Sequence, residues 1–196
     1  SDTCDAWYKG HPELVTLERI RQLTLSKGLA NRPPKTHWYQ TFDFARLLLS
    51  PFAMDRLGKT LDLNNIVDFF AHTRSVRCKD GSIGTREGAN LMAINCSGFL
   101  KGEIEIMFPD IIVTQGARAR NSLAGAFPVI RRVSMQGYPN TFYQIVQITA
   151  SHTAIMIVAK HPCARGRNGW KHGEKNQFMD WAVKCVQEFI PVSKQS

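Results

Sequence analysis

The chain has 196 residues, of which 43% are hydrophobic and 21% charged. That size and balance suit one globular domain over residues 1–196 and exclude an extended disordered chain. The net charge of +9 and the pI of about 9.6 favour a polyanionic partner, nucleic acid first, although solubility alone also explains a basic surface. No apolar run approaches the ~20 residues of a membrane span, so we expect no membrane partner.

Apolar spacing and chain-breaking residues predict the elements of the first half. Periodic apolar residues indicate helices, and Gly or Pro marks their ends. A continuous apolar run bounded by polar residues indicates a buried strand. In chain order we expect a helix over Pro12–Lys27, a loop over Asn31–Lys35, a helix over Phe42–Leu49, a strand over Ile66–Ala71, a polar loop over Cys78–Gly88 and a helix over Glu87–Met107.

The second half predicts more strands. Alternating residues with a turn at Gly137–Asn140 indicate a hairpin. The expected elements are strands over Ile111–Thr114, Val129–Met135, Phe142–Ile148 and Ala154–Ala159, and helices over Ala117–Leu123 and Asn176–Ile190. This order predicts an α/β fold, a three-layer α/β/α sandwich around a central, mostly parallel sheet.

Two predicted strands stop abruptly at small or polar residues. Ile111–Gly116 ends in Thr-Gln-Gly, and the strand before His161 ends in His-Pro. In open α/β sheets, chemistry lies beyond the carboxyl ends of the strands. An imidazole there could donate to an oxygen that gains negative charge as a bond breaks. The alternative is a solvated basic turn.

The residues after His161 suit a phosphate. Pro162 fixes the local backbone, so the following amides point one way, and arginines stand beside them. Arg74 lies in another basic stretch, after the predicted Ile66 strand, where a solvated charge run is the alternative. The candidate nucleic-acid-binding residues are Arg74, Cys163, Ala164, Arg165, Arg167 and Lys171.

Five cysteines in irregular spacing argue against a secreted disulfide framework and favour a reducing compartment, the cytoplasm or nucleus. Cys78 and Cys96 flank a loop and the predicted long helix, and Cys4 could join them as a metal ligand. Core cysteines are the alternative. Cys185 lies on the apolar face of the last helix, and we expect it in the core.

With these motifs in order, residues 42–190 resemble the uracil-DNA glycosylase superfamily, particularly its iron–sulfur branches. The resemblance is carried by the stretches Thr73–Cys78, Asn95–Leu100, Phe108–Gly116 and His161-Pro-Cys163, followed by Arg165, Asn168, Gly169 and Trp170. It implies a monomeric DNA glycosylase that flips uracil or another deaminated base out of the helix and hydrolyses its N-glycosidic bond. It assigns His161 to the departing base and Cys4, Cys78 and Cys96 to a 4Fe-4S cluster.

Two departures leave another function open. The family's early motif is not evident: Gly28–Arg32 is the nearest stretch, and the motif would otherwise lie upstream of Ser1. Arg74 stands where the family has a base-reading Asn, and a guanidinium has no acceptor for a uracil edge. The main alternative is therefore a non-catalytic DNA- or protein-binding module on the same fold. A second is an unrelated α/β enzyme for a small phosphorylated substrate.

Overall fold

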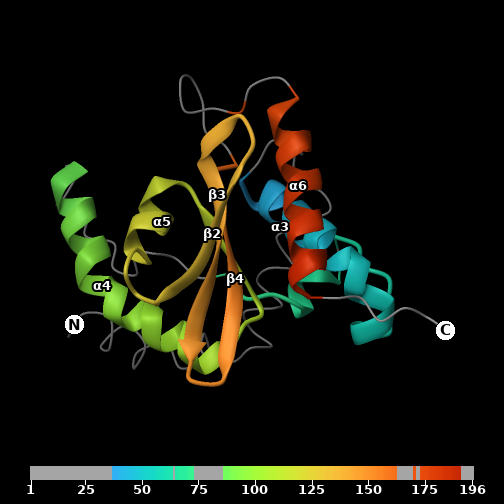
Figure 1. Cartoon of the computed structure of the whole chain (residues 1–196), viewed down its shortest axis with the longest axis horizontal. Coiled ribbons are helices and arrows are strands. Elements are labelled where there is room, and N and C mark those ends of the chain that lie inside the picture. Colours follow the sequence, from blue (N-terminus) through green and yellow to red (C-terminus); the bar gives the residue numbers. More distant parts are fainter. Residues whose placement is uncertain (1–36, 64, 73–85, 163–169, 171–172, 191–196) are drawn as a thin grey trace, which may run out of the picture. The chain divides into compact units, whose positions relative to one another are not determined.

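The computed structural model describes residues 37–63, 65–72, 86–162, 170 and 173–190 (Figure 1). The chain divides into two compact units. The first unit comprises Ser1–His72 and Val192–Ser196, and the second comprises Thr73–Pro191. Each unit is described by itself.

The described part of the first unit, residues 37–63 and 65–72, contains one long helix followed by short ones. Helix α3 (His37–Leu49) confirms the helix predicted over Phe42–Leu49 and begins five residues earlier. An ion pair one turn apart links Arg46 to Asp43 at 2.8 Å. Next come the 3₁₀-helix η3 (Ser50–Phe52), the π-helix η4 (Ala53–Leu57) and the 3₁₀-helix η5 (Ile66–Asp68). Within the described part, Phe42, Ala53, Leu61 and Ile66 form a buried cluster.

The prediction of a strand over Ile66–Ala71 is wrong, because the first three of these residues form η5. The cause is local hydrogen bonding. The backbone N–H of Asp62 donates to Oδ1 of Asn65, and the N–H of Asn65 donates to Oδ1 of Asp62, both at 2.9 Å. This reciprocal turn favours a helical start. Phe70 then packs edge-on against Phe42 of α3, with ring centroids 5.0 Å apart, so this ring makes a core contact without the run forming a strand.

The described residues of the second unit form a four-stranded sheet in the order β1-β4-β3-β2. The strands are β1 (Ile111–Gln115), β2 (Val129–Met135), β3 (Tyr138–Thr149) and β4 (His152–Ala159). They confirm the four strands predicted after Pro109. β1 pairs with β4 in parallel, in the register Ile111 to Ile155 through Gln115 to Ala159.

The expectation of a mostly parallel sheet is wrong for the described strands, because β3 pairs antiparallel with both β2 and β4. The short connections explain it: a tight turn can join only antiparallel strands, whereas parallel strands need a long crossover. The predicted turn also lies earlier than expected. β3 already begins at Tyr138, and Gly137 provides the positive φ of 77° that the tighter turn requires.

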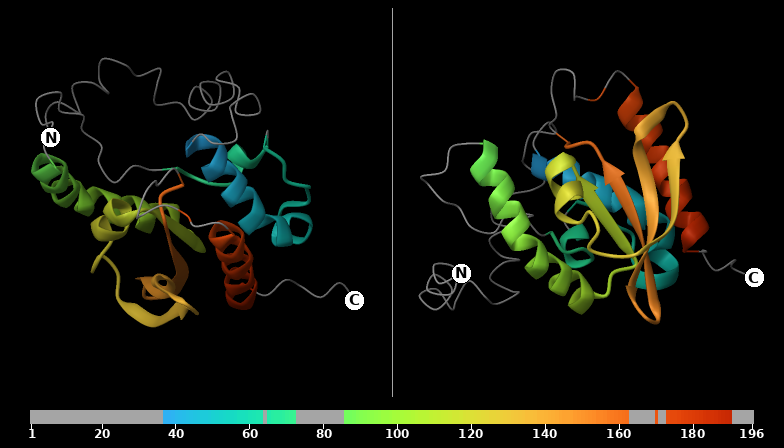
Figure 2. Two further views of the ribbon diagram at one scale, coloured as in Figure 1. Left: turned by 90° about the horizontal axis from the view of Figure 1, so that it is seen from above. Right: turned by 60° about the vertical axis from the view of Figure 1, so that its left-hand side comes forward.

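Helices pack on both faces of this sheet (Figures 1 and 2). Helices α4 (Arg86–Met107) and α5 (Ala117–Ser122) cover one face, and α6 (Glu174–Phe189) covers the other. All three confirm predicted helices. On the first face a buried cluster joins α4 to the sheet through Leu100, Ile104, Ile112, Val146, Ala154 and Met156. On the second face the ring of Tyr143 lies 5.9 Å from that of Trp181 in α6.

Strand β4 is the centre of the second unit. Its six residues from Ala154 to Ala159 are all buried. Burying such aliphatic side chains contributes roughly 1.5–3 kcal/mol each. The strand therefore provides a rigid base for the residues that follow it. None of the described helices combines the length and the apolar content that crossing a membrane requires.

Candidate functional site

The carboxyl ends of β1 and β4 lie next to each other. This follows from the parallel register, in which the last residue of β1, Gln115, pairs with the last residue of β4, Ala159. The N–H of Gly116 donates to the carbonyl of Ala159 at 2.8 Å and extends the pairing by one step. The two motifs predicted to end at the same edge of the sheet are thus brought together.

Position 116, where the chain contacts His161, requires a glycine. Its φ is +90°, a conformation that residues with a Cβ rarely adopt. A Cβ added at Gly116 would lie 3.2 Å from the Cβ of His161. The glycine therefore serves two purposes. It allows the backbone to turn out of β1, and it lets the chain that carries the imidazole approach closely.

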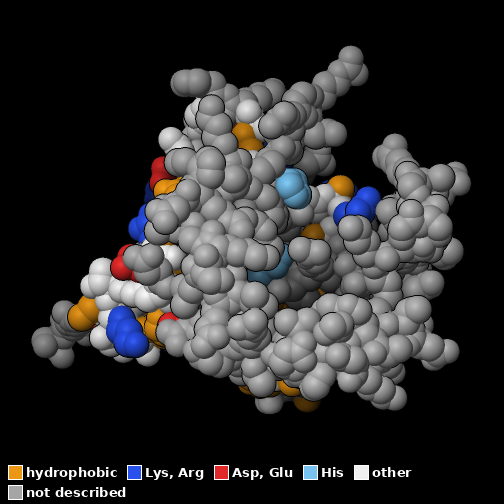
Figure 3. Space-filling model, turned by 180° about the vertical axis from the view of Figure 1, so that it is seen from behind, with side chains coloured by type: hydrophobic (Ala, Val, Ile, Leu, Met, Phe, Trp, Pro, Cys, Tyr) orange, Lys and Arg blue, Asp and Glu red, His pale blue; other side chains and the backbone are white. Residues whose placement is uncertain are grey.

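His161 is exposed, as a residue that meets a ligand must be. Figure 3 shows that histidine side chains of the described residues reach the molecular surface. The strand beneath His161 is buried, so the imidazole is attached to a rigid element rather than to the middle of a long loop. A catalytic group needs such support, because small errors in its position reduce its effect strongly.

A partly buried ion pair lies beside His161 that no pattern in the sequence predicted. Nζ of Lys160 lies 2.6 Å from Oε1 and 2.9 Å from Oε2 of Glu174, the first residue of α6. The side chain of Glu174 is 3% exposed and that of Lys160 28%. Fourteen residues separate the partners in sequence, so no helical or strand spacing signals the contact.

An aromatic side chain lies against the lysine of this ion pair. Nζ of Lys160 lies 5.6 Å from the ring centroid of Trp170, a cation–π distance. Trp170 packs against Phe178 of α6, with centroids 5.2 Å apart, and Phe178 is fully buried. The indole N–H of Trp170 is buried and has no hydrogen-bond partner within the described part of the chain. The contact with Trp170 adds a second restraint on the ammonium group of Lys160.

Two arginines that the sequence reasoning did not select follow Gly116 directly. Arg118 and Arg120 belong to α5, and the N–H of Arg120 donates to the carbonyl of Gly116. Arg118 is exposed and Arg120 is partly exposed. A six-residue helix spans only about 9 Å, so both guanidinium groups start close to the strand ends. The clustering of Arg in Ala117-Arg-Ala-Arg-Asn121 was the signal that could have identified them.

Most other predicted site residues cannot be placed. Arg74, Cys163, Ala164, Arg165, Arg167 and Lys171 lie outside the described residues, as do Cys4 and Cys78. The backbone of Cys96 belongs to α4, and its side chain lies outside the described part. Of the predicted catalytic and binding set, the described structure therefore positions His161.

Cys185 confirms its predicted place in the core. It is buried on α6 as a free thiol, with 8% of its surface exposed. Burial, together with the nearby negative charge of Glu188, raises the pKa of the Cys185 thiol to about 11. The thiolate is the reactive form, so this cysteine is chemically inert at neutral pH.

Comparisons with known proteins assign no family to the chain. Searches of protein-family models, of curated proteins and of solved structures find no match. Any function of this chain has to follow from the chemistry of its own residues and from the resemblance of its motifs.

Proposed function

We propose that the chain is a DNA glycosylase that removes uracil or another deaminated base. One observation supports this above all others: His161 and Gly116 meet at the carboxyl ends of two parallel strands. These residues belong to the two motifs that carry the resemblance. The proposal includes a uracil-DNA glycosylase-like fold for the whole chain, and DNA as the partner of a monomer.

In the proposed reaction, the target nucleotide leaves the base stack and its base lies against the end of the sheet. The N-glycosidic bond breaks and its electron pair remains with the base, which becomes an anion. His161 donates a hydrogen bond to the oxygen that gains the charge. Water then adds to C1′ of the sugar, and its proton balances the charge of the base. A donor aimed at the developing charge is worth more than one aimed at the ground state.

Charge supports DNA as the substrate. The chain carries a net charge of +9, and Arg118 and Arg120 lie next to the strand end that carries Gly116. Phosphate contacts dominate the affinity of such proteins for DNA. Arg74, Arg165, Arg167 and Lys171 remain proposed phosphate or base contacts, together with the backbone of Cys163 and Ala164.

The test is base release by the unmodified protein. Duplex and single strands that contain uracil, hypoxanthine or xanthine are incubated with the protein, and abasic sites are counted after alkaline cleavage. Strands with only normal bases serve as the control. We expect release of at least one deaminated base above that control. If no base is released although the strands are bound, the chain is a non-catalytic DNA-binding module.

A 4Fe-4S cluster held by Cys4, Cys78 and Cys96 belongs to the same proposal. Such clusters need thiolate ligands, normally four. Protein purified without oxygen should be brown and contain iron. Cys78→Ala or Cys96→Ala should lose the colour, whereas Cys185→Ala should keep it because Cys185 is a core thiol. Colourless, iron-free protein would make these cysteines structural.

A further inference from the structure

We infer that Lys160 and Glu174 are positioning residues for His161. The inference rests on the proposed function, because it gives the pair a purpose in base release. Lys160 lies between the last residue of β4 and His161, and its ammonium group contacts both carboxylate oxygens of Glu174. The pair thus fixes the peptide from which the imidazole extends.

Lys160 and His161 contact different elements. The side chain of Lys160 reaches α6 through Glu174, whereas the Cβ of His161 lies against Gly116 at the end of β1. The carbonyl of Ala159 is held by the N–H of Gly116. Three contacts, one from α6 and two from Gly116, therefore restrain the three consecutive residues from Ala159 to His161. Connecting segments are generally more mobile than the strands they follow. Three restraints on this segment therefore indicate that its position matters.

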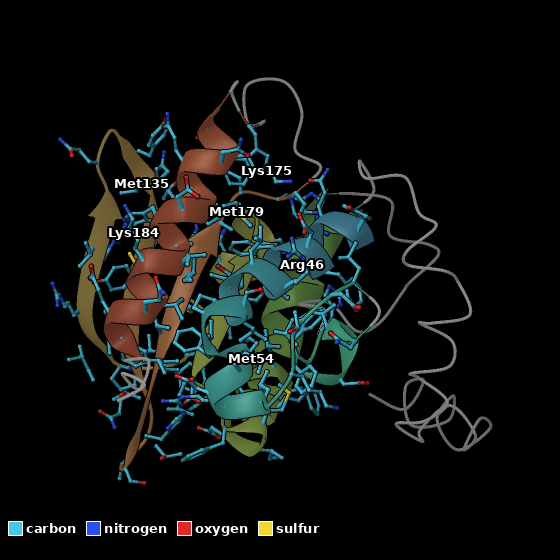
Figure 4. All side chains as sticks on the ribbon, turned by 90° about the vertical axis from the view of Figure 1, so that its right-hand side faces the viewer. Arg46, Met54, Met135, Lys175, Met179 and Lys184 are labelled. Atoms are coloured by element: carbon cyan, nitrogen blue, oxygen red, sulfur yellow. The ribbon has the colours of Figure 1, made fainter. Side chains whose placement is uncertain are left out.

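Glu174 is itself attached to a rigid element. It opens the 16-residue helix α6, where the helix dipole favours a negative charge. The hydroxyl of Tyr138 donates to Oε1 of Gln177 at 3.1 Å and fastens this half of α6 to β3. Figure 4 shows Lys175 and Met179 along the same half of the helix and Met135 on neighbouring β2. Both methionines are 9% exposed, as expected for packed side chains.

The energetics of a buried ion pair support a positional role. Removing two charges from water offsets most of their attraction, so two apolar side chains of similar volume often stabilise a protein equally well. Such a pair is therefore weak evidence for stability, and we assign it a positional role instead. The pair also links the start of the connection between β4 and α6, which runs from Lys160 to Gly173, to the first residue of α6.

The experiment compares Glu174→Gln, Lys160→Met and the double variant Lys160→Met/Glu174→Leu with the unmodified chain. Single-turnover base release is measured at saturating DNA, and Kd and Tm are measured separately. Each single variant should slow release about 10- to 100-fold, because a displacement on the order of 1 Å has that effect on a catalytic group. Kd should change less than about threefold, since phosphate contacts determine it.

The double variant separates position from stability. It leaves no buried unpaired charge, so its Tm should return to near the parent value while release stays slow. Lys160→Arg keeps the charge and should recover most of the rate. The matched control is Lys101→Met, which breaks the exposed Lys101–Glu105 pair of α4 and should change neither rate nor Tm. A double variant as fast as the parent would overturn the inference.

A readout independent of activity distinguishes this inference from the proposed function. The ring resonances of His161 are identified by NMR from their loss in His161→Ala. In Glu174→Gln they should shift and broaden, although the substitution is 13 residues away, whereas in Lys101→Met they should stay unchanged. Unchanged resonances in Glu174→Gln would refute the positioning role. Shifted resonances in a protein that releases no base would support that role and refute the glycosylase.

Discussion

The two ends of β4 each carry a histidine, and the two are held in different ways. At the amino end, Nε2 of His152 lies 3.0 Å from the carbonyl oxygen of Pro109, and its ring stacks on Phe108 with centroids 3.8 Å apart. At the carboxyl end, His161 is exposed beside Gly116 and the Lys160–Glu174 pair. His152 joins β4 to the segment between α4 and β1, whereas His161 is an exposed residue that follows the end of β4.

This difference separates a histidine with structural contacts from the histidine proposed to be catalytic. The contacts of His152 are to a backbone carbonyl and a ring, and they close the turn between α4 and β1. Phe108 even adopts a φ of +50°, unusual for a residue with a Cβ, while stacked on it. Around His161, Gly116 and the ion pair of Lys160 restrain the neighbouring backbone, and the residue is exposed. A catalytic group must be held in position, and this backbone provides part of that support.

Replacing each of the two histidines by alanine is the strongest test of this comparison. His161→Ala should reduce base release about 10²- to 10³-fold with little change in Tm, because it removes one donor to the leaving base. His152→Ala should keep the rate per folded molecule and lose about 1–3 kcal/mol of stability, because it removes a hydrogen bond and a stacked ring. Single-turnover kinetics and urea unfolding measure the two effects. Equal rates for His161→Ala and the parent would exclude His161 as the electrophile.

A pair of glycines sharpens the comparison at the carboxyl end. Gly116 and Gly125 both have positive φ, but a Cβ would meet another residue only at Gly116; at Gly125 nothing described lies within 4 Å. Gly116→Ala and Gly125→Ala should each lose roughly 1 kcal/mol from backbone strain. Only Gly116→Ala should also slow base release, by about 10-fold or more, because it displaces His161. A Gly125→Ala variant that slows release equally would mean that strain, not contact, matters.

The pH dependence of stability tests whether Cys185 of α6 is a buried core thiol. The raised pKa of Cys185, about 11 against an ordinary 9.0, keeps the folded thiol protonated while the unfolded thiol ionises. Its contribution is fully present below pH 9 and is lost as the pH rises toward 11, by at most about 1.4 kcal/mol per unit. Cys185→Ala should flatten this part of the profile in urea unfolding. Burial also raises the pKa of Tyr143, so some slope should remain in the variant.

The smallest effect should come from the arginines of α5. If Arg118 contacts a phosphate, Arg118→Ala weakens DNA binding only a few-fold at moderate salt, but lowers the slope of log Kd against log salt by about 1. Arg120→Ala should do the same if it also contacts a phosphate. Lys184→Ala, an exposed change on α6, is the control and should keep the parent slope. Equal slopes in all the variants would remove α5 from the DNA surface.

The local sequence pattern alone was sufficient to predict most of the described elements of the second unit. The apolar periodicity of α4 and α6, and the β-branched runs of β1 and β4, identified them because each element buries one regular face or run. Cys185 could be assigned to the core for the same reason. The close placement of the ends of β1 and β4 also followed, because strand ends that carry polar residues tend to meet at one edge of an α/β sheet.

Tertiary structure alone decided the rest. The run at Ile66 formed η5 because the Asp62–Asn65 turn and the ring of Phe42 outweighed its strand-like composition. β3 turned antiparallel to β4 because the turn between them is too short for a crossover. The Lys160–Glu174 pair joins residues with no periodic relation in the chain. Sequence determines contacts within one element through its period, but contacts between elements depend on how their surfaces pack, and no local pattern records that.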